Sequence, residues 1–452
     1  MKLTLTSVCF ALCGLIVAAP LAHAAASPED AAKLKTSLTP LGAERAGNKE
    51  GTIPAWTGGY STVPAGYKSG DARPDPFGNE KAVISITAKN MDQYADKLSD
   101  GIKALLKKYP DSYRVDVYPT HRTANAPQWV YDNTFKNATR AKTKDGGVHI
   151  EGAYGGIPFP IPQTGAEIMW NNALMWTGDT VQLNFHNYLT TADGKRTAIT
   201  RGQVYWQYPY YFKEGSLESF NGMYARAILF QSEPAFKAGE SLLIHYFTDK
   251  SQQAWQYLAG QRRVRRAPTV AYDTPNDITS GVENYDEIQV FNGDFDRYNL
   301  KVVGKRELFV PYNTMKVHLA SNDERLGTKH LNPDFVRWEL HRVWVVEATL
   351  AEGKRHVMPH RIFYLDEDTW GAVLADGWDA QGQLWRTNMG LPTVIPEGPF
   401  VHTKMSYTST NHLTGAYVVS GTADYKGGPF WGLVARKPDS AFTPDALAAA
   451  GR

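Results

Sequence analysis

The sequence predicts an α+β protein built on one large antiparallel sheet with a few helices. From about residue 180 onward, short segments of alternating polar and apolar residues are separated by tight-turn signals. The segments VQLNFHNYLTT and VRWELHRVWVVEATL, for example, come before Asp193-Gly194 and Glu352-Gly353. Strands do not alternate regularly with helices, which argues against a parallel sheet. A sheet of this size must pack on a second sheet, curl around helices or hold a ligand to cover one face.

The chain begins with the pattern of a secretory signal peptide. Lys2 precedes an apolar run, and the small residues Ala22 and Ala24 form a cleavage site. We therefore expect residues 1–24 to be removed and residues 25–452 to form a single domain in the periplasm of a Gram-negative envelope. Both cysteines lie in this predicted peptide, so the mature chain has no disulfide and no thiolate site.

An extended N-terminal segment is predicted over about residues 25–110. Ser27 is placed to cap a helix that starts at Pro28. Gly- and Pro-rich sequence then predicts little regular structure to about residue 80. Apolar residues at spacings of three and four predict a helix over 90–109, and residues 113–135 alternate like strands.

The most unusual local sequence is GGIPFPIPQTGAEIMWNNALMW. Its three prolines predict an extended approach to a helix. Thr164 and Glu167 predict a capping box at the start of that helix. The helix carries Trp170 on its apolar stripe, and Trp176 follows closely.

Two later stretches predict strands and hairpins. On a strand, Val336, Trp338 and Leu340 share one face, and polar residues occupy the other. The stretch RIFYLDEDTWGAVLADGWDAQGQLWR predicts consecutive hairpins with turns at Asp366–Asp368, Asp376-Gly377 and Gln381-Gly382.

The sequence carries no recognisable catalytic or cofactor-binding signature. We find no GxSxG, HExxH, GxxxxGK[ST] or GxGxxG motif. His356 and His360 are four residues apart, but Pro359 lies between them and the surroundings are strand-like, which argues against a helical metal pair. Lysine plus arginine (48) and aspartate plus glutamate (46) nearly cancel, so no global field attracts nucleic acid. We expect no metal, no cofactor, no nucleic-acid partner and no enzyme activity.

Aromatic residues make up 12% of the chain, and many alternate along predicted strands. Aromatic side chains fill the core of any large sheet, which is one interpretation. The other is a cavity that they line for an apolar ligand. The sequence leaves both interpretations open.

The stretch AWQYLAGQRRVRRAP places four arginines in five positions after an aromatic strand. On a strand, Arg263 and Arg265 share one face, while Arg262, Val264 and Arg266 share the other. Arginines at a sheet edge discourage strand-to-strand aggregation. Alternatively, their forked donors grip an anionic head group, and Trp255 and Tyr257 nearby contact the apolar part of the same lipid.

Several long stretches resemble an exported bacterial family, the domain of unknown function 1329. They are GGIPFPIPQTG, AWQYLAGQRRVRRAPTVAYD, NGDFDRYNLKVVGKRELFVPYN and WELHRVWVVEA, in this order. Members of the family are often labelled outer-membrane lipoprotein-sorting-protein-like. The resemblance implies a fold similar to periplasmic lipoprotein carriers: a strongly curved antiparallel sheet, an unclosed barrel, wrapped over a few helices. It also implies work near an inner-membrane transporter and an outer-membrane protein.

We therefore expect a periplasmic binding or shuttle protein for a lipid-like or hydrophobic molecule held in the hollow of the sheet. An envelope hydrolase and a non-catalytic docking partner of a transporter or outer-membrane protein are the alternatives. The candidate ligand-binding residues are aromatic or basic positions on the predicted helix and strands: Trp170, Trp176, Trp255, Tyr257, Arg263, Arg265 and Trp338.

Overall fold

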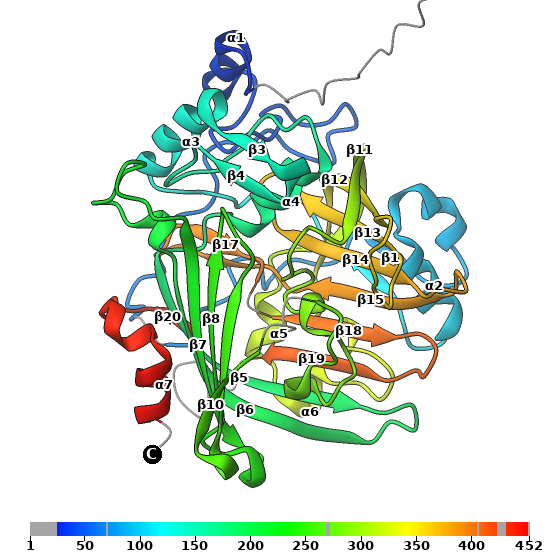
Figure 1. The fold of residues 1–452 in the computed structure, drawn as a ribbon. Coiled ribbons are helices and arrows are strands. Elements are labelled where there is room, and N and C mark those ends of the chain that lie inside the picture. The colour runs from blue at the N-terminus through cyan, green and yellow to red at the C-terminus, as the bar shows by residue number, and fades with distance from the viewer. Residues whose placement is uncertain (1–24, 69–70, 268–271, 405, 423–430, 451–452) are drawn as a thin grey trace, which may run out of the picture.

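The computed structural model describes residues 25–68, 71–267, 272–404, 406–422 and 431–450. The predicted signal peptide lies outside the described residues. Within them, most of the strands join one 16-stranded sheet, and two small hairpins stand apart (Figure 1). None of the helices in these ranges is long and apolar enough to cross a membrane.

The helices are short, and the strands vary from three to 14 residues. The α-helices in the described ranges are α1 (Pro28–Ala32), α2 (Asp100–Lys108), α3 (Gln128–Arg140), α4 (Gly165–Ala173), α5 (Met315–Leu319), α6 (Asn322–Arg325) and α7 (Pro444–Ala450). The strands up to the middle of the chain are β1 (Ile84–Ile86), β2 (Val115–Val117), β3 (Lys142–Lys144), β4 (His149–Glu151), β5 (Thr180–Thr190), β6 (Arg196–Gln207), β7 (Met223–Glu233), β8 (Ser241–Phe247), β9 (Gln253–Leu258) and β10 (Arg263–Arg266). The later strands are β11 (Tyr298–Pro311), β12 (Trp338–Leu350), β13 (His360–Asp366), β14 (Ala372–Trp378), β15 (Leu384–Gly390), β16 (Thr393–Ile395), β17 (Phe400–His402), β18 (Tyr407–Asn411), β19 (Tyr417–Thr422) and β20 (Trp431–Leu433).

The main sheet is open and almost entirely antiparallel. Its strand order is β1-β2-β12-β13-β14-β15-β18-β19-β5-β6-β7-β8-β9-β10, with β11 paired to β12 and β20 paired to β5. Among the described pairings, only β2 with β12 is parallel. The two ends of this order do not pair, so the barrel is unclosed. The predicted fold class, a large curved antiparallel sheet with a few helices, is confirmed.

The sheet has two halves, which lie at a steep angle to each other in Figure 1. We call β11–β15 the covered half and β5–β10 the open half. In the covered half, alternate residues of β13 pack on opposite sides: Phe363 and Leu365 join the core inside the curve, and Tyr364 joins a second core outside it. Helix α2 covers that outer side with Ile102 and Leu105. Both faces of β13 are therefore largely buried.

Helix α4 lies inside the curve, between the two halves. The predicted capping box is present, because the Thr164 side chain accepts from the Glu167 amide and the Glu167 side chain accepts from the Thr164 amide. Ile168, Met169 and Trp170 of α4 are buried in the same core as residues of both halves. On the outer side of the open half, α7 packs against β8 to β10 (Figure 1).

The N-terminal segment departs from the prediction in two places. Ser27 caps α1 as predicted, but the helix predicted over 90–109 is wrong as one element. It is a 3₁₀ segment, Met91–Lys97, followed by α2, because the Ser99 side chain accepts from the Ile102 amide and starts a new helix there. The predicted strands over 113–135 are also partly wrong: β2 forms, but α3 begins at Gln128.

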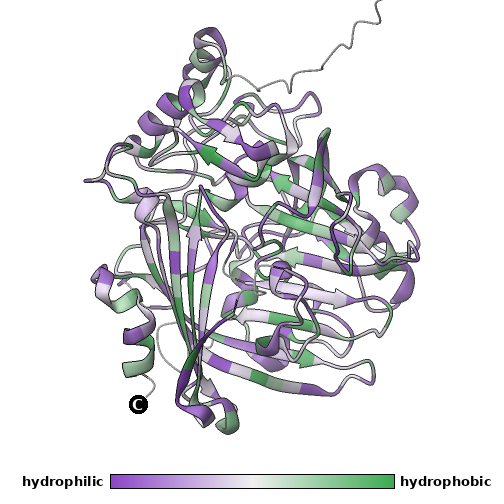
Figure 2. Ribbon diagram, in the orientation of Figure 1, coloured by the Kyte–Doolittle hydropathy of each residue, from purple (hydrophilic) through white to green (hydrophobic). Residues whose placement is uncertain are grey.

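Hydrophobic and hydrophilic residues alternate along the long strands (Figure 2), as the sequence pattern predicts. The turns predicted at Asp193-Gly194, Glu352-Gly353 and Gln381-Gly382 connect neighbouring strands. The turn predicted at Asp376-Gly377 is wrong, because both residues lie within β14 and pair with β15.

One long connection crosses the mouth of the curve. We call residues 272–297 the cover segment. Buried hydrogen bonds join it to the sheet. The Arg361 guanidinium donates to Asp286 at 2.5 Å, and the Tyr407 hydroxyl donates to Glu283 at 2.8 Å. Val290 in this segment has a φ of 71°, which is costly for a β-branched residue and turns the backbone sharply.

Candidate functional site

An apolar row crosses the inner face of the open half. Leu183 of β5 pairs with Val204 of β6, Val204 with Leu229 of β7, and Leu229 with Leu242 of β8. Partners in register point to the same face of a sheet, so these side chains lie side by side. The row continues from Leu242 through Gln256 to Arg265 on the edge strand β10.

This row forms the floor of a hollow of about 100 Å³ that opens to solvent. A second row, with Trp206, Ala227 and Ile244, lines it as well. The cover segment closes one side with Ile278 and Ile288. The result is a mostly apolar concavity, which we call the hollow.

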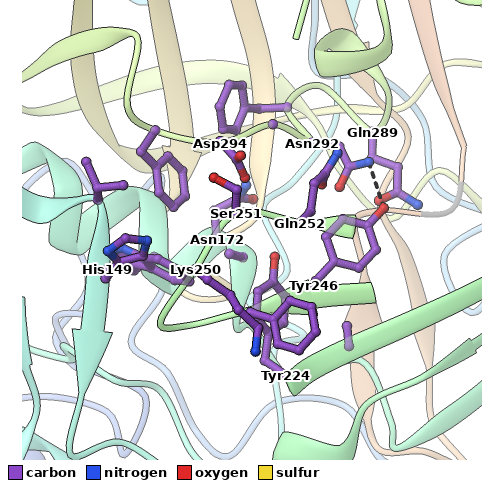
Figure 3. Close-up of a pocket in the computed structure, with 18 of the residues that line it drawn as sticks. His149, Asn172, Tyr224, Tyr246, Lys250, Ser251, Gln252, Gln289, Asn292 and Asp294 are labelled. Atoms are coloured by element: carbon purple, nitrogen blue, oxygen red, sulfur yellow. Dashed lines mark hydrogen bonds between the residues drawn. The ribbon is translucent and has the colours of Figure 1, made fainter. Parts of the chain in front are cut away.

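A second cavity, which we call the chamber, adjoins the hollow. Its interior has a volume of about 40 Å³, and it opens to solvent. The two cavities share lining residues: Trp206, Tyr246, Gln289 and Asn292. The Asn292 side chain donates to the Tyr246 hydroxyl at 3.1 Å, at the boundary between them (Figure 3).

The chamber is more polar than the hollow. Figure 3 shows His149, Asn172, Lys250, Gln252 and Asp294 around it. Lys404, which follows β17, also lines it, and its Nζ donates to the Ala173 carbonyl at 3.2 Å. Burial lowers the pKa of Lys404 to about 7. Burial also raises the pKa of Asp294 above its ordinary value.

Of the candidate ligand-binding tryptophans on the inner side, Trp170 alone lines the chamber. Its indole donates to the Gly147 carbonyl at 2.9 Å, and its ring contacts Phe295 of the cover segment edge-on. Trp176 is buried nearby and packs against Tyr211 and Phe400. Trp338 lies in the other core, outside the curve, beside α2. The structure therefore does not bring these three side chains together.

The candidates on β9 and β10 divide between the two faces of the sheet. Trp255 and Tyr257 lie on the outer face and pack with Phe442 and Leu447 near α7. Arg263 and Arg265 are exposed, and the register places Arg265 on the same face as the apolar row. Their role in binding an anionic group stays a prediction.

Sequence reasoning missed most of the residues that line the two cavities. Lys404, Lys250 and Asp294 come from segments far apart in the chain, and no local motif joins them. The alternation in VQLNFHNYLTT and AITRGQVYWQYPYYF identifies inward-facing positions such as Leu183 and Val204. It does not show which of those positions face space rather than core.

His341, Asp366 and Asp368 are the one group among the described residues that approaches metal-ligand geometry. His341 lies between Glu339 at 3.1 Å and Asp366 at 3.5 Å, and these carboxylates raise its pKa to about 9 against the effect of burial. Arg122 holds Asp368 with two hydrogen bonds of 2.8 and 2.6 Å. These residues are engaged with one another and with Arg122 in a buried ion network.

The family model described as "Protein of unknown function (DUF1329)" matches residues 85–448. The chain belongs to this family. The uncharacterized protein PA3922 of Pseudomonas aeruginosa is 42% identical over 373 residues, which cover 80% of this chain and 81% of that one. The predicted family resemblance is confirmed.

Similar solved structures share little sequence with this chain. A putative outer membrane lipoprotein-sorting protein domain from Vibrio parahaemolyticus is 14% identical with a TM-score of 0.43, and covers 62% of this chain and 97% of its own. A DUF1329 family protein from Desulfovibrio piger is 14% identical with a TM-score of 0.42, covering 63% and 97%. A LolA superfamily protein from Nitrosomonas europaea is 14% identical with a TM-score of 0.37, covering 63% and 100%.

Proposed function

We propose that this protein binds and shuttles a hydrophobic molecule in the cell envelope, and that it holds this molecule in the hollow of the open half. The observation that carries the proposal is the apolar row from Leu183 to Leu242, which belongs to the inner core and also lines the partly open hollow. In the covered half, the equivalent inner face is filled by side chains. An apolar face left open in one half is therefore a feature that needs a ligand or partner to cover it.

Affinity in such a site comes mainly from apolar area removed from water, at about 25 cal/mol per Å². The hollow offers mostly apolar side chains, with Asn187, Asn276 and Thr279 at its borders. Sites for small hydrophobic ligands have this composition: apolar walls with a few polar groups that fix orientation. A soluble shuttle needs such a site to shield its cargo from water.

The envelope location in this proposal rests on the N-terminal sequence, whose basic start, apolar run and small-residue cleavage site match an export signal. An inner-membrane transporter that loads the cargo and an outer-membrane protein that receives it are the proposed partners. Cross-linking in intact cells followed by identification of the linked proteins tests this part.

Arg263 and Arg265 extend the proposal to the edge of the open half. Both are exposed on β10, and Arg265 continues the apolar row of the hollow. We propose that they contact anionic groups outside the hollow, where forked guanidinium donors bind phosphate or carboxylate oxygens.

The test places a charge in the hollow. Leu229→Asp puts a carboxylate in the middle of the apolar row, and Ala198→Asp puts one at an exposed position of β6 as the matched control. Binding of the neutral dye Nile red is measured by fluorescence, and folding by thermal unfolding. We expect Leu229→Asp to weaken dye binding about tenfold or more while Ala198→Asp leaves it unchanged, since an unpaired charge opposes an apolar ligand. Equal binding by both folded variants would contradict the proposal.

A further inference from the structure

The chamber continues the hollow at one end of its strands. Tyr246 and Trp206 line both cavities and their rings stack on each other, so the two cavities meet at these side chains. The hollow has mostly apolar walls, whereas the chamber carries two amines, four amides and a carboxylate. A ligand that fills both cavities has one apolar part and one polar part.

The chamber offers hydrogen-bond donors that the protein does not use. Gln252 Nε2 is buried without a partner. Asn172 also lines the chamber, and its side-chain oxygen accepts from the Ala372 amide at 2.9 Å. Buried donors that lack acceptors are costly, so a structure that keeps them is suited to a ligand that supplies acceptors.

The two lysines of the chamber also lack an anionic partner. Among the residues that the structure describes, no carboxylate lies within ion-pair distance of Lys404 or Lys250. Lys404 reaches only the Ala173 carbonyl, and Lys250 lies over the Phe247 ring at 4.1 Å. The low pKa of Lys404 is the mark of an ammonium that is removed from water without a counter-charge.

The single acidic group of the chamber is already engaged. Asp294 accepts from the Ser251 side chain, from the backbone N–H of Gln252 and from the Tyr272 hydroxyl at 3.4 Å. Its oxygens are therefore held by protein donors at the wall. The free hydrogen-bonding capacity of the chamber is on the donor side.

We propose that the cargo of the hollow is an amphiphile with a compact anionic head, and that the chamber binds this head through Lys404, Lys250, Asn172 and Gln252. This inference rests on the proposed function and gives it a ligand class: a carboxylate or phosphate head on an apolar chain. Two charged donors and two amide donors match the oxygens of such a head. The chain lies along the apolar row, away from the chamber.

The placement fixes the orientation of the ligand. The chamber lies at the Ala225 and Tyr246 end of β7 and β8, which pair there. Arg263 pairs with Leu258, next to Tyr257, which pairs with Ser241 at the opposite end of β8. The head is therefore enclosed at one end of the strands, and the exposed arginines lie at the other.

The test compares probes that differ only in the head. Hexadecanoate, hexadecyl phosphate and the neutral hexadecanol displace Nile red from the wild-type protein, from Lys404→Met and from the control Lys142→Met, an exposed lysine of β3. We expect Lys404→Met to weaken both anionic probes about tenfold to a hundredfold, and hexadecanol by less than about threefold. Lys142→Met is expected to match the wild type. Lys404→Arg keeps the charge and is expected to restore most of the loss, which guards against a fold defect in Lys404→Met.

The outcomes separate the two proposals. If the neutral and anionic probes bind equally well and Lys404→Met weakens none of them, the anionic head is wrong while the hollow stands. If charge reversal of Arg263 and Arg265 removes the preference for anionic probes and Lys404→Met does not, the head lies at β10 and the chamber assignment is overturned. If neither Nile red nor hexadecanol binds, the proposed function itself fails. The stronger of the two anionic probes tells whether the head is a carboxylate or a phosphate.

Discussion

The covered half and the open half belong to one sheet, yet the cavity beside the open half contains lysines without a carboxylate partner in the part of the chain that the structure describes, whereas the charges of the covered half form a dense ion network. In the covered half, Arg122 is held by Asp368 and by backbone carbonyls of the N-terminal segment, and His341 is held by Glu339. In the open half, Arg226 is paired with Asp439, but among the described residues Lys404 and the exposed Lys250 of the chamber have no carboxylate partner. The ion network of the covered half stabilises the fold. The two lysines of the chamber are instead available to bind an anionic group of a ligand, as we propose.

The two halves also differ in what covers their faces. Cores on both sides enclose the covered half, so its side chains have no space to move. The open half has α7 on its outer face (Figure 1). Part of its inner face lines the hollow. Stability and binding are thereby assigned to different parts of one sheet, which predicts that substitutions can separate them.

The largest effect is expected from the ion network of the covered half. Arg122→Leu leaves Asp368 buried without a partner, which costs about 3–5 kcal/mol of unfolding free energy. Arg201→Leu, at an exposed pair with Glu233, is the control and costs about 0–1 kcal/mol. Urea unfolding measures both. Nile red affinity at conditions where Arg122→Leu stays folded is expected to be unchanged, and a large loss of affinity would contradict the separation of the halves.

A smaller effect concerns the cover segment and depends on pH. Burial, helped by the nearby Glu287, raises the pKa of Glu283 to about 8. Because this folded-state pKa is above the usual value of 4.5, the stabilising contribution is complete below about pH 4.5 and is lost as the pH rises through about 8. The variant Glu283→Gln removes this contribution.

Between pH 4.5 and pH 8, we expect the unfolding free energy of the wild type to fall by about a few kcal/mol relative to that of Glu283→Gln. Urea unfolding of both proteins across this pH range measures the difference. A difference that stays constant or rises with pH would show that Glu283 does not hold a proton in the folded protein.

The smallest effect is expected at the edge of the open half. Arg263→Glu with Arg265→Glu reverses two exposed charges, so the free energy of unfolding changes within about 0.5 kcal/mol. Retention of an anionic amphiphile is expected to weaken by less than about tenfold, and less at high salt because exposed charges are screened. The control is Lys136→Glu with Lys213→Glu, which changes two exposed residues outside β10 and gives the same net charge as the arginine double variant. A loss equal in the two double variants would remove the specific role of β10.

Local chemistry made part of this fold predictable. The capping box at Thr164 and the turn at Asp193-Gly194 depend on neighbouring residues alone, and both form as predicted. Asp376-Gly377 has the same turn composition, but it lies in β14. Tertiary contacts override the local preference there, because Asp376 accepts from the Gly101 amide at 3.1 Å and from Thr387 at 3.0 Å.

The site was less predictable than the fold. Alternation in the strands identifies Leu183 and Val204 as inward-facing, but it cannot tell a hollow from a core. Lys404 follows a short strand of a separate hairpin, and it meets Lys250 only when β17, α4 and the turn after β8 come together. Single-sequence patterns carry no record of such a meeting.

The central claim is that the open half holds an amphiphile, and the direct measurement is on protein isolated without detergent from the cells that make it. Native mass spectrometry gives the stoichiometry, and solvent extraction identifies what is bound. The account predicts close to one amphiphile with an anionic head per chain, and little or none on Leu229→Asp. An empty wild-type protein that also takes up neither Nile red nor hexadecanoate would contradict it.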